Sequence, residues 1–269
     1  MSRMQKVLFF VTAWLICLMP FLFWWNTWFG RKLSDQQLNE YLHDTKKPRH
    51  IQQALVQVGE RITRRDASAK RWYPELLRLA NDRVEEVRNT DAWVMGQDPS
   101  GAGFHEILLK LLGDPSQMVR GNAALSLVRF GDASGRSQIV ALLAPAQITS
   151  PESGRIVDSD RPGTAIHQGG LVAKLERNNK QMAEIRSPIP GRIRSVAGTG
   201  ANIAAGAEIA VIDPANEQVW EALRALYLIG QPDDLAAIRP YERDLPDVSD
   251  NVRQQATETE QAITKRSNR

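Results

Sequence analysis

The sequence has a single cysteine among its 269 residues, Cys17, which lies within an apolar run near the N-terminus. One thiol supports neither an internal disulfide framework nor a cysteine-based metal site. Lysine and arginine are interspersed with acidic residues, and the net charge is only +3. Without a dense basic stripe interleaved with aromatic residues, nucleic acid is an unfavoured partner, and we expect a solvated surface of mixed charge.

Motifs of the common enzyme classes are missing as well. The sequence contains no GxSxG or HExxH, and GAGFHE and GTGANIAAG lack the glycine placement of phosphate-binding loops. The histidines are scattered without metal-ligand spacing; they are His43, His50, His105 and His167. We therefore expect a protein that is not an enzyme, with no catalytic residue, no metal site and no bound cofactor.

A long apolar segment lies near the N-terminus. The 23 residues from Val7 to Phe29 carry no charge, and basic residues flank them on both sides. Such a run is long enough to cross a hydrocarbon core of roughly 30 Å. It exceeds the apolar core of a cleaved signal peptide, which is the alternative, and no small-residue cleavage site follows it. We predict an N-terminal tail and transmembrane anchor at 1–32, embedded in a lipid bilayer.

The distribution of charge does not determine on which side of the membrane the rest of the chain lies. More basic residues follow the apolar segment than precede it, so a literal positive-inside count would leave the body in the cytoplasm. That rule is weak for long translocated domains. A short basic tail ahead of a long apolar segment is also typical of an uncleaved secretory anchor.

The pattern after the apolar segment is helical. Ser34 followed by Gln37 is a capping-box pattern, and Leu38 and Leu42 then fall on one face, which predicts a helix that begins near Asp35.

The helical pattern then repeats with a period of 32 residues. LLRLAND at 76–82 returns as LLKLLGD at 108–114, and EVRNTDAW at 86–93 is echoed by MVRGNAAL at 118–125. This echo predicts a two-helix unit that must stack on its neighbours to bury its apolar face. Asp82, Asp114 and Asp132 are expected to form turns, with Asp114 also able to cap the next helix and Pro115 at its first position.

The stretch VRxxAAxxLxxFGD at 119–132 resembles a HEAT repeat, including the variant of phycobilin-lyase-related families. Segments 219–238 and 249–263 resemble further pieces of such repeats. The resemblance implies a helical solenoid that serves as a docking surface. Because roughly three repeats are needed for a stable stack, we expect the C-terminal helices, 214–266, to pack on the first block, 33–145.

Between the two helical blocks one phrase occurs twice. SPESGRIV at 150–157 returns as SPIPGRIR at 187–194, and residues 148–176 align with 185–213 without a gap at ten identical positions. Glycines at equivalent places mark turns around short β runs. Each half is predicted to be a small meander that cannot cover its own apolar face. Two halves related by a pseudo-two-fold axis can cover each other.

These two halves resemble the biotinyl/lipoyl-type domain, a barrel-sandwich hybrid, and in particular the version in membrane fusion proteins of the hemolysin-secretion type. Carrier members of that family attach biotin or lipoate to a lysine at the hairpin between the halves, and Lys180 is the corresponding position. Asn179 and Gln181 depart from the carriers' flanking residues. The eight residues 177–184 leave no room for the long helical hairpin of fusion proteins.

Together these features predict an α+β multidomain protein: a transmembrane helix, then an α-helical HEAT-like solenoid interrupted by an all-β barrel-sandwich hybrid domain at 146–213. The combination favours a non-catalytic adaptor in the bacterial inner membrane, with its body in the periplasm, that docks protein components of an envelope transport or secretion assembly. Two alternatives stay open. One is a carrier that uses Lys180, and the other is a cytoplasmic-side scaffold for a membrane enzyme.

Overall fold

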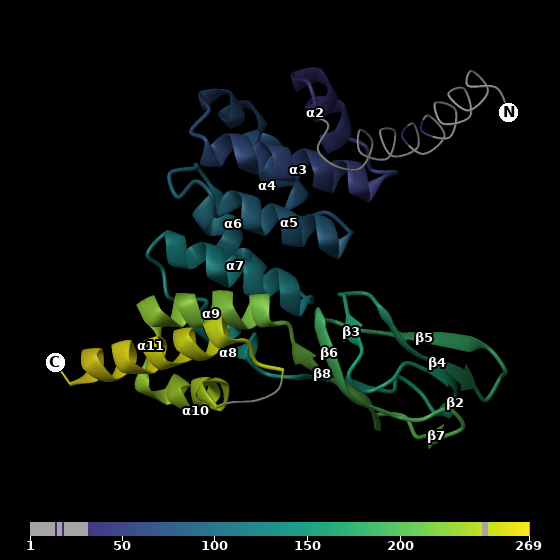
Figure 1. Ribbon diagram of the computed structural model, residues 1–269. Coiled ribbons are helices and arrows are strands. Elements are labelled where there is room, and N and C mark those ends of the chain that lie inside the picture. Colours follow the sequence, from purple (N-terminus) through teal and green to yellow (C-terminus); the bar gives the residue numbers. More distant parts are fainter. Residues whose placement is uncertain (1–13, 15–17, 19–31, 244–246, 269) are drawn as a thin grey trace, which may run out of the picture. The chain divides into compact units, whose positions relative to one another are not determined.

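A computed structural model describes residues 14, 18, 32–243 and 247–268 of the chain (Figure 1). The chain forms two compact units, residues 1–57 and residues 58–269, and each is described by itself.

The first unit contains α2 (Asp35–Leu42) and most of α3 (Pro48–Thr63). Ser34 accepts a hydrogen bond from the backbone N–H of Gln37, while the Gln37 side chain accepts one from the backbone N–H of Ser34. This reciprocal pair satisfies two backbone donors that a helix start leaves free. The predicted capping box and the start of the helix are therefore confirmed, and Leu38 and Leu42 are fully buried on one face.

The predicted transmembrane helix, from Val7 to Phe29, lies outside the described residues except for Trp14 and Leu18. Within the part of the chain that is described, no helix has both the length and the apolar character needed to cross a bilayer. The longest described helix, α11 (Asp250–Ser267), carries polar and charged residues along its whole length. This finding contradicts the predicted membrane anchor and the inner-membrane, periplasmic localisation, and we retain neither.

The second unit begins with a stack of paired helices (Figure 1). Its elements in this part are η1 (Ala67–Trp72), α4 (Tyr73–Leu79), α5 (Glu85–Met95), α6 (Phe104–Leu111), α7 (Gln117–Arg129) and α8 (Arg136–Ala141). Equivalent apolar positions 32 residues apart are buried in both pairs, as Leu79 and Leu111 show in the first helices and Val87 and Val119 in the second. The period predicted from the sequence is therefore the period of the helical stack.

Aspartates organise the turns between these helices. Asp82, Asp114 and Asp132 each accept a hydrogen bond from the backbone N–H two residues further on, at 2.8, 2.8 and 2.7 Å. Their predicted role as turn formers is confirmed. The expectation that Asp114 caps α7 and that Pro115 is its first residue is wrong, because α7 begins at Gln117 and Ser116 is the N-cap.

The chain returns to the helical stack after the β region. The later elements are α9 (Asn216–Ile229), η2 (Pro232–Asp234), α10 (Leu235–Ile238), η3 (Arg239–Glu242) and α11. One cluster of buried side chains joins Ala124 of α7 and Ile139 of α8 with Leu226 of α9 and Ile263 of α11. The predicted boundaries at 145/146 and 213/214 stay a prediction, since the compact units divide only after residue 57.

The β region consists of two four-stranded antiparallel sheets. Its strands are β1 (Ala146–Thr149), β2 (Gly154–Ser159), β3 (Ala165–Ile166), β4 (Leu171–Arg177), β5 (Met182–Arg186), β6 (Gly191–Val196), β7 (Asn202–Ile203) and β8 (Glu208–Pro214). The sheet orders are β1-β8-β6-β3 and β5-β4-β2-β7. When each of β1 to β4 is exchanged with its equivalent among β5 to β8, one sheet order becomes the other. Each sheet therefore contains two strands from each half. Their apolar residues form one shared core.

The repeated serine and glycine link the two halves. Gly169 donates its backbone N–H to the carbonyl of Ser187, and Gly206 donates to the carbonyl of Ser150, each at 2.8 Å. Both glycines have positive φ, a conformation that favours a residue without a Cβ. Each half therefore supplies the turn that fastens the serine of the other half, which explains why the phrase occurs twice.

The two sheets do not close into a barrel. Each keeps open edges, and the edge strands β3 and β7 are only two residues long. Such short strands cannot supply the continuous ladder of hydrogen bonds that closure requires. The predicted barrel-sandwich hybrid is therefore corrected to two small antiparallel sheets, and the likeness to fusion proteins of the hemolysin-secretion type is not confirmed.

Candidate functional site

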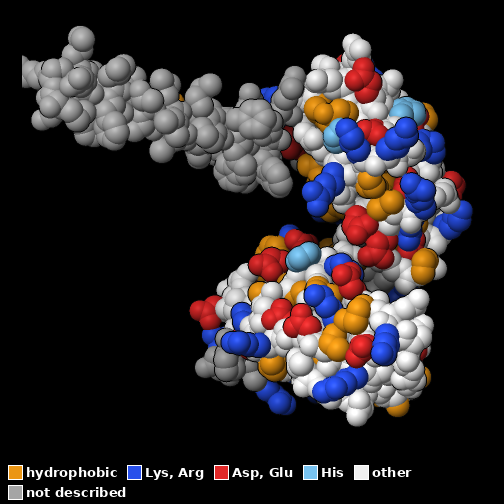
Figure 2. All heavy atoms as spheres, turned by 90° about the vertical axis from the view of Figure 1, so that its right-hand side faces the viewer, with side chains coloured by type: hydrophobic (Ala, Val, Ile, Leu, Met, Phe, Trp, Pro, Cys, Tyr) orange, Lys and Arg blue, Asp and Glu red, His pale blue; other side chains and the backbone are white. Residues whose placement is uncertain are grey.

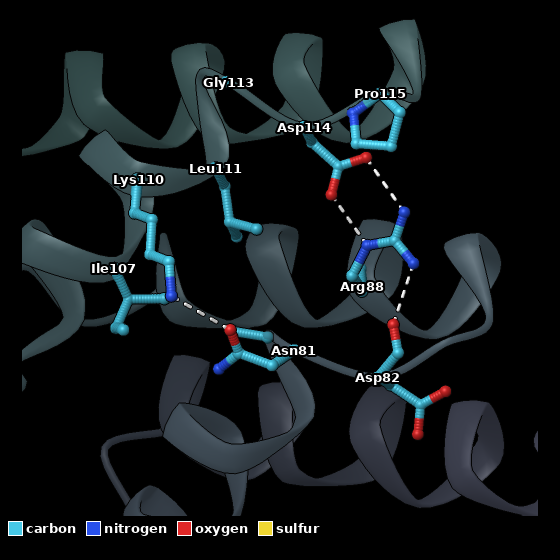
Figure 3. Close-up of a pocket in the computed structure, with 10 residues that line it drawn as sticks. Asn81, Asp82, Arg88, Ile107, Lys110, Leu111, Gly113, Asp114 and Pro115 are labelled. Atoms are coloured by element: carbon cyan, nitrogen blue, oxygen red, sulfur yellow. Dashed lines mark hydrogen bonds and ion pairs between the residues drawn. The ribbon is translucent and has the colours of Figure 1, made fainter.

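Adjacent helical repeats are joined by an arginine. Arg88 on α5 donates from Nε and Nη2 to the two carboxylate oxygens of Asp114, at 2.7 and 2.9 Å, and from Nη1 to the carbonyl of Asp82 at 2.8 Å (Figure 3). The two side chains are only 12% and 6% exposed. Burial pushes the pKa of Asp114 upward, but hydrogen bonds from Arg88 and Ser116 outweigh it and hold that pKa below its usual value.

The groove around this ion pair has a volume of about 360 Å³. Lys110, on its opposite side, donates to the side chain of Asn81 at 3.1 Å (Figure 3). Both Asp114 oxygens accept hydrogen bonds from Arg88, and one of them also accepts from the backbone of Ser116. Because the Asp114 oxygens already accept hydrogen bonds within the protein, we interpret the groove as a structural contact that holds one repeat to the next.

A stripe of solvent-facing side chains runs along the second helices of the repeats. Trp93 on α5 and Leu125 on α7 occupy equivalent positions 32 residues apart, as do Gln97 and Arg129. Trp93 is 39% exposed although it is a large aromatic residue. Arg129 donates to the side chain of Gln97 at 2.7 Å, so α5 and α7 are joined at their C-terminal ends.

The stripe continues onto α9 as a groove of about 360 Å³ between α7, α9 and α11. Leu125 and Arg129 line it on one side, and Tyr227 and Leu228 of α9, which are 42% and 62% exposed, line it further along. Gln255 and Glu258 of α11 line its far side; hereafter, the binding stripe means Trp93, Gln97, Leu125, Arg129, Tyr227 and Leu228.

Charges of both signs are mixed on the face of the molecule that Figure 2 shows. Figure 2 shows Lys and Arg side chains intermixed with Asp and Glu, with hydrophobic side chains between them. This face therefore fits the expected surface of mixed charge. It shows no basic stripe of the kind that nucleic acids bind.

The structure places Lys180 at the tip of the β4–β5 hairpin. Its φ of 64° is one of two positive values among the described residues other than glycine. Its backbone N–H donates to the carbonyl of Arg177 at 2.9 Å, and Asn179 accepts a hydrogen bond from the backbone of Gln181 at 3.0 Å. The polar neighbours of Lys180 therefore shape the turn, and the lysine lies at its exposed end.

The described histidines do not converge on one site. His43 and His50 belong to the first unit, where His50 contacts Asp44 at 2.9 Å, while His105 contacts Asp132 at 2.7 Å in the second. Across the described ranges, no group of three or more His, Cys, Asp or Glu side chains is placed to hold a metal ion.

Two features of the structure are not indicated by the sequence. Asp91 is completely buried, which its place among the polar residues of α5 did not indicate. A cavity of about 1000 Å³ lies between helices and sheet, and its lining residues range from Ser137 to Val248. No local pattern brings such distant residues together, although one residue that differs between the β halves, Arg194 where the first half has Val157, lines this cavity.

Residues 106–134, which span α6 and α7, match the family model described as HEAT repeat. No curated protein matches the chain. Among solved structures, a computationally designed armadillo repeat protein for modular peptide recognition is 17% identical, with a TM-score of 0.40 over 84% of this chain and 81% of the other. An engineered protein is 18% identical, with a TM-score of 0.41 over 86% and 80%.

A third solved structure, a single-chain, multi-domain long-chain acyl-CoA carboxylase, is 16% identical, with a TM-score of 0.25 over 51% of this chain and 14% of the other. All three scores are low. The assignment of a repeat solenoid therefore rests on the family match and on the observed helical pairs. HEAT repeats point to a scaffold for protein interactions as the general class of function.

Proposed function

We propose that the protein is a non-catalytic scaffold that binds another protein through the binding stripe. The observation that carries this proposal is the exposure of Trp93 on α5 and of Tyr227 and Leu228 on α9, the last two in a groove that Leu125 of α7 also lines. Large apolar side chains gathered on a surface mark interaction sites, and tryptophan and tyrosine are enriched among the residues that dominate binding energy.

The chemistry of the stripe supports the same function. Apolar side chains alternate with polar groups that already have partners, as Arg129 does with Gln97. On α9 the Arg224 guanidinium lies 4.5 Å from the centre of the Trp220 ring. On such a surface, apolar side chains can be buried against a partner while polar side chains around them stay hydrated, as is usual at protein interfaces.

A narrower role as an envelope adaptor is not part of the proposal. That role depended on the membrane anchor and on the fusion-protein likeness of the β region. Neither is supported by the described part of the chain.

The test is affinity isolation of partners with the wild type, with the double variant Trp93→Ala/Leu228→Ser, and with Val157→Ser as a matched control. Val157 is also an exposed apolar residue, at 36%, but lies on β2 away from the stripe. A protein retained by the wild type and the control should be lost by the double variant. With the purified partner, affinity should fall about 30-fold, equivalent to roughly 2 kcal/mol.

Circular dichroism should show that the double variant still folds. Equal retention of every partner by all three proteins would rule out the stripe as the binding surface. So would a partner that is lost from the Val157→Ser control as well.

A second candidate function is favoured by one observation, the exposed place of Lys180 at a hairpin tip. A lysine in that position is accessible to an enzyme that attaches biotin or lipoate through an amide bond. Intact mass spectrometry of natively expressed protein tests it: the carrier function predicts a mass increment that disappears in Lys180→Ala. An unmodified mass would reject this function and leave the scaffold proposal untouched.

A further inference from the structure

A cavity of about 1000 Å³ lies between the helical part of the second unit and the sheet β1-β8-β6-β3. On this sheet it is lined by Ala165 of β3, Arg192 of β6 and Asp213 of β8, which are cross-strand neighbours. Side chains alternate along a strand, and Ile193, between the lining residues Arg192 and Arg194, belongs to the buried core of the β region. The cavity therefore lies over the outward face of the sheet, and residues of the helical part complete its lining.

Short side chains leave this space open. More than half of the lining residues are alanine, proline, valine or leucine, and alanine and proline are the commonest among them. Alanine and proline lose no rotamer freedom when they are buried, so a molecule that enters the cavity has few side chains to order. The lining is therefore preformed and largely apolar, as in most small-molecule sites.

The arginines of the lining are already paired. Arg194 donates two hydrogen bonds to the carboxylate of Asp213, one of them from Nε at 3.0 Å. Arg192 contacts Asp247 at 3.2 Å. An anion that binds an arginine must compete with these aspartates, and a cation that binds an aspartate must displace an arginine. Glu217, the remaining charged residue of the lining, is exposed to water, which screens its attraction for a cation.

Tyr241 leaves this balance of charge unchanged. Its hydroxyl donates to the carbonyl of Leu143, which joins η3 to the residues after α8. Burial raises the pKa of Tyr241 to about 12, so the hydroxyl keeps its proton at neutral pH. A charged ligand would lose hydration in this cavity without gaining a partner of opposite charge that is both buried and unpaired. An uncharged molecule avoids that cost.

The internal repeat provides a reference for the sheet residues at the cavity. Three lining residues with short apolar side chains have polar equivalents 37 residues earlier or later in the chain: Ala165 and Asn202, Pro214 and Arg177, and Ala215 and Asn178. Arg194 is an exception, since its equivalent is Val157, but Asp213 pairs with it. Apart from that paired arginine, the sheet positions at the cavity are more apolar than their equivalents outside it.

We propose that this cavity is a binding site for an uncharged, apolar small molecule. The site is separate from the binding stripe, because no stripe residue lines it, and the proposal does not rest on the function of the stripe. The preformed apolar lining stabilises such a molecule in the cavity. The paired charges select against acids and amines that carry the same apolar body.

The test measures the fluorescence of two uncharged dyes, Nile red and prodan, with the full-length protein. Ala144→Trp and Ala165→Trp each place a large side chain in the cavity, and both positions are exposed lining residues. Asn202→Trp places the same side chain at an equivalent exposed position outside the cavity and is the matched control. At least one dye should bind the wild type and the control saturably, and both obstructed variants should bind it about tenfold more weakly or worse. Circular dichroism should show that all three variants fold.

Octanol, octanoate and octylammonium then compete with the bound dye, because they share one alkyl chain and differ in the charge of the head group. Octanol should displace the dye at a concentration about tenfold below that of either ion. The double variant Trp93→Ala/Leu228→Ser should bind the dye as the wild type does.

Failure of both dyes to bind the wild type saturably would overturn the proposal. Binding by the obstructed variants that equals binding by the wild type would also overturn it, as would loss of binding in the stripe double variant. Displacement by either ion at or below the concentration needed for octanol would show that the cavity selects a charged ligand, and the proposal would then be wrong.

Discussion

Asp91 lies in the middle of α5 with no exposed surface, and neither of its carboxylate oxygens has a hydrogen-bond partner among the described residues. Burial raises the pKa of this carboxyl well above its usual value, and the positive charge of Arg78 offsets only part of that shift. A charged form would lose its hydration without compensation, so the proton is retained in the folded protein.

The first prediction concerns this residue and pH. Since the pKa of Asp91 is raised in the folded state, its contribution to stability is present below the unfolded value of about 3.9 and is lost as pH rises towards the folded value. Asp91→Asn should therefore be nearly neutral at pH 4 and stabilising by roughly 1 to 3 kcal/mol at pH 8. Urea unfolding at both pH values measures this difference.

The control for that experiment is Asp233→Asn, at an exposed aspartate of η2. It should show no comparable gain between the two pH values. A gain at Asp91→Asn that does not grow with pH would mean that the carboxyl is ionised or hydrated in the folded protein.

The second prediction concerns the buried pair of Arg88 and Asp114. Arg88→Ala should cost about 3 to 5 kcal/mol, because it leaves the Asp114 carboxylate buried without its cation. As the matched control, Arg64→Ala removes the exposed partner of Glu60, where the side chains are 64% and 51% exposed, and should cost at most about 0.5 kcal/mol. Denaturant unfolding compares the two, and equal costs would show that Arg88 does not lock the repeats.

At the scale of elements, the repeated Gly-Arg-Ile begins both β2 and β6. A Cβ on Gly154 would lie 2.4 Å from the carbonyl oxygen of Glu176, and a Cβ on Gly191 would lie 1.8 Å from that of Asp213. Both distances are far below van der Waals contact with rigid backbone. The glycine of the phrase is thus required at each strand start, where the neighbouring strand passes too close for a side chain.

The third prediction follows from that close approach. Gly154→Ala and Gly191→Ala should each destabilise the protein by about 2 kcal/mol or more, because a strand must move away. Gly198→Ala is the matched control, since its Cβ would meet nothing within 4 Å and its φ is not positive. That change should be neutral or stabilise by up to about 1 kcal/mol. Thermal unfolding of the three variants tests the contrast, and equal melting temperatures would contradict it.

At the scale of the whole molecule, the β region lies between two helical segments that share one core. Ala146 pairs with Ile212 across the antiparallel ladder of β1 and β8, so the two ends of the β region are neighbours. Arg136 of α8 also contacts Asp234 of η2 at 2.6 Å, across 98 residues of sequence. The helical stack is therefore continuous in space although it is interrupted in sequence.

The fourth prediction concerns this continuity. A chain that ends at Asp213 loses α9 and α11 and exposes buried residues such as Ile139 and Leu142, so its melting temperature should fall by several degrees. Deleting 147–213 and joining the ends with a short Gly/Ser linker should instead leave a cooperatively unfolding helical protein. Calorimetry measures both, and an unchanged melting temperature in the truncated chain would show that the C-terminal helices do not stabilise the stack.

Several features of this protein could be predicted from the sequence because they depend on residues close together in the chain. The capping box of α2 needs only Ser34 and Gln37, and the aspartate turns each need only the next two residues. Repeated patterns also allow predictions about segments that lie further apart in the chain. The 32-residue echo predicted equivalent helical pairs, and the doubled phrase predicted two halves that cover each other.

Other features were decided by the tertiary structure, because they depend on which faces of distant segments meet. The resemblance to the biotinyl/lipoyl-type domain implied a barrel-sandwich hybrid, but the two-residue edge strands β3 and β7 leave two open sheets. It offered no sign that Asp91 is buried or that Arg88 pairs with Asp114, 26 residues away. Whether a polar residue is buried depends on the neighbouring helix that packs over it, and not on the helix to which it belongs. A cavity likewise depends on two surfaces that pack incompletely against each other. Both features therefore arise only when the chain packs.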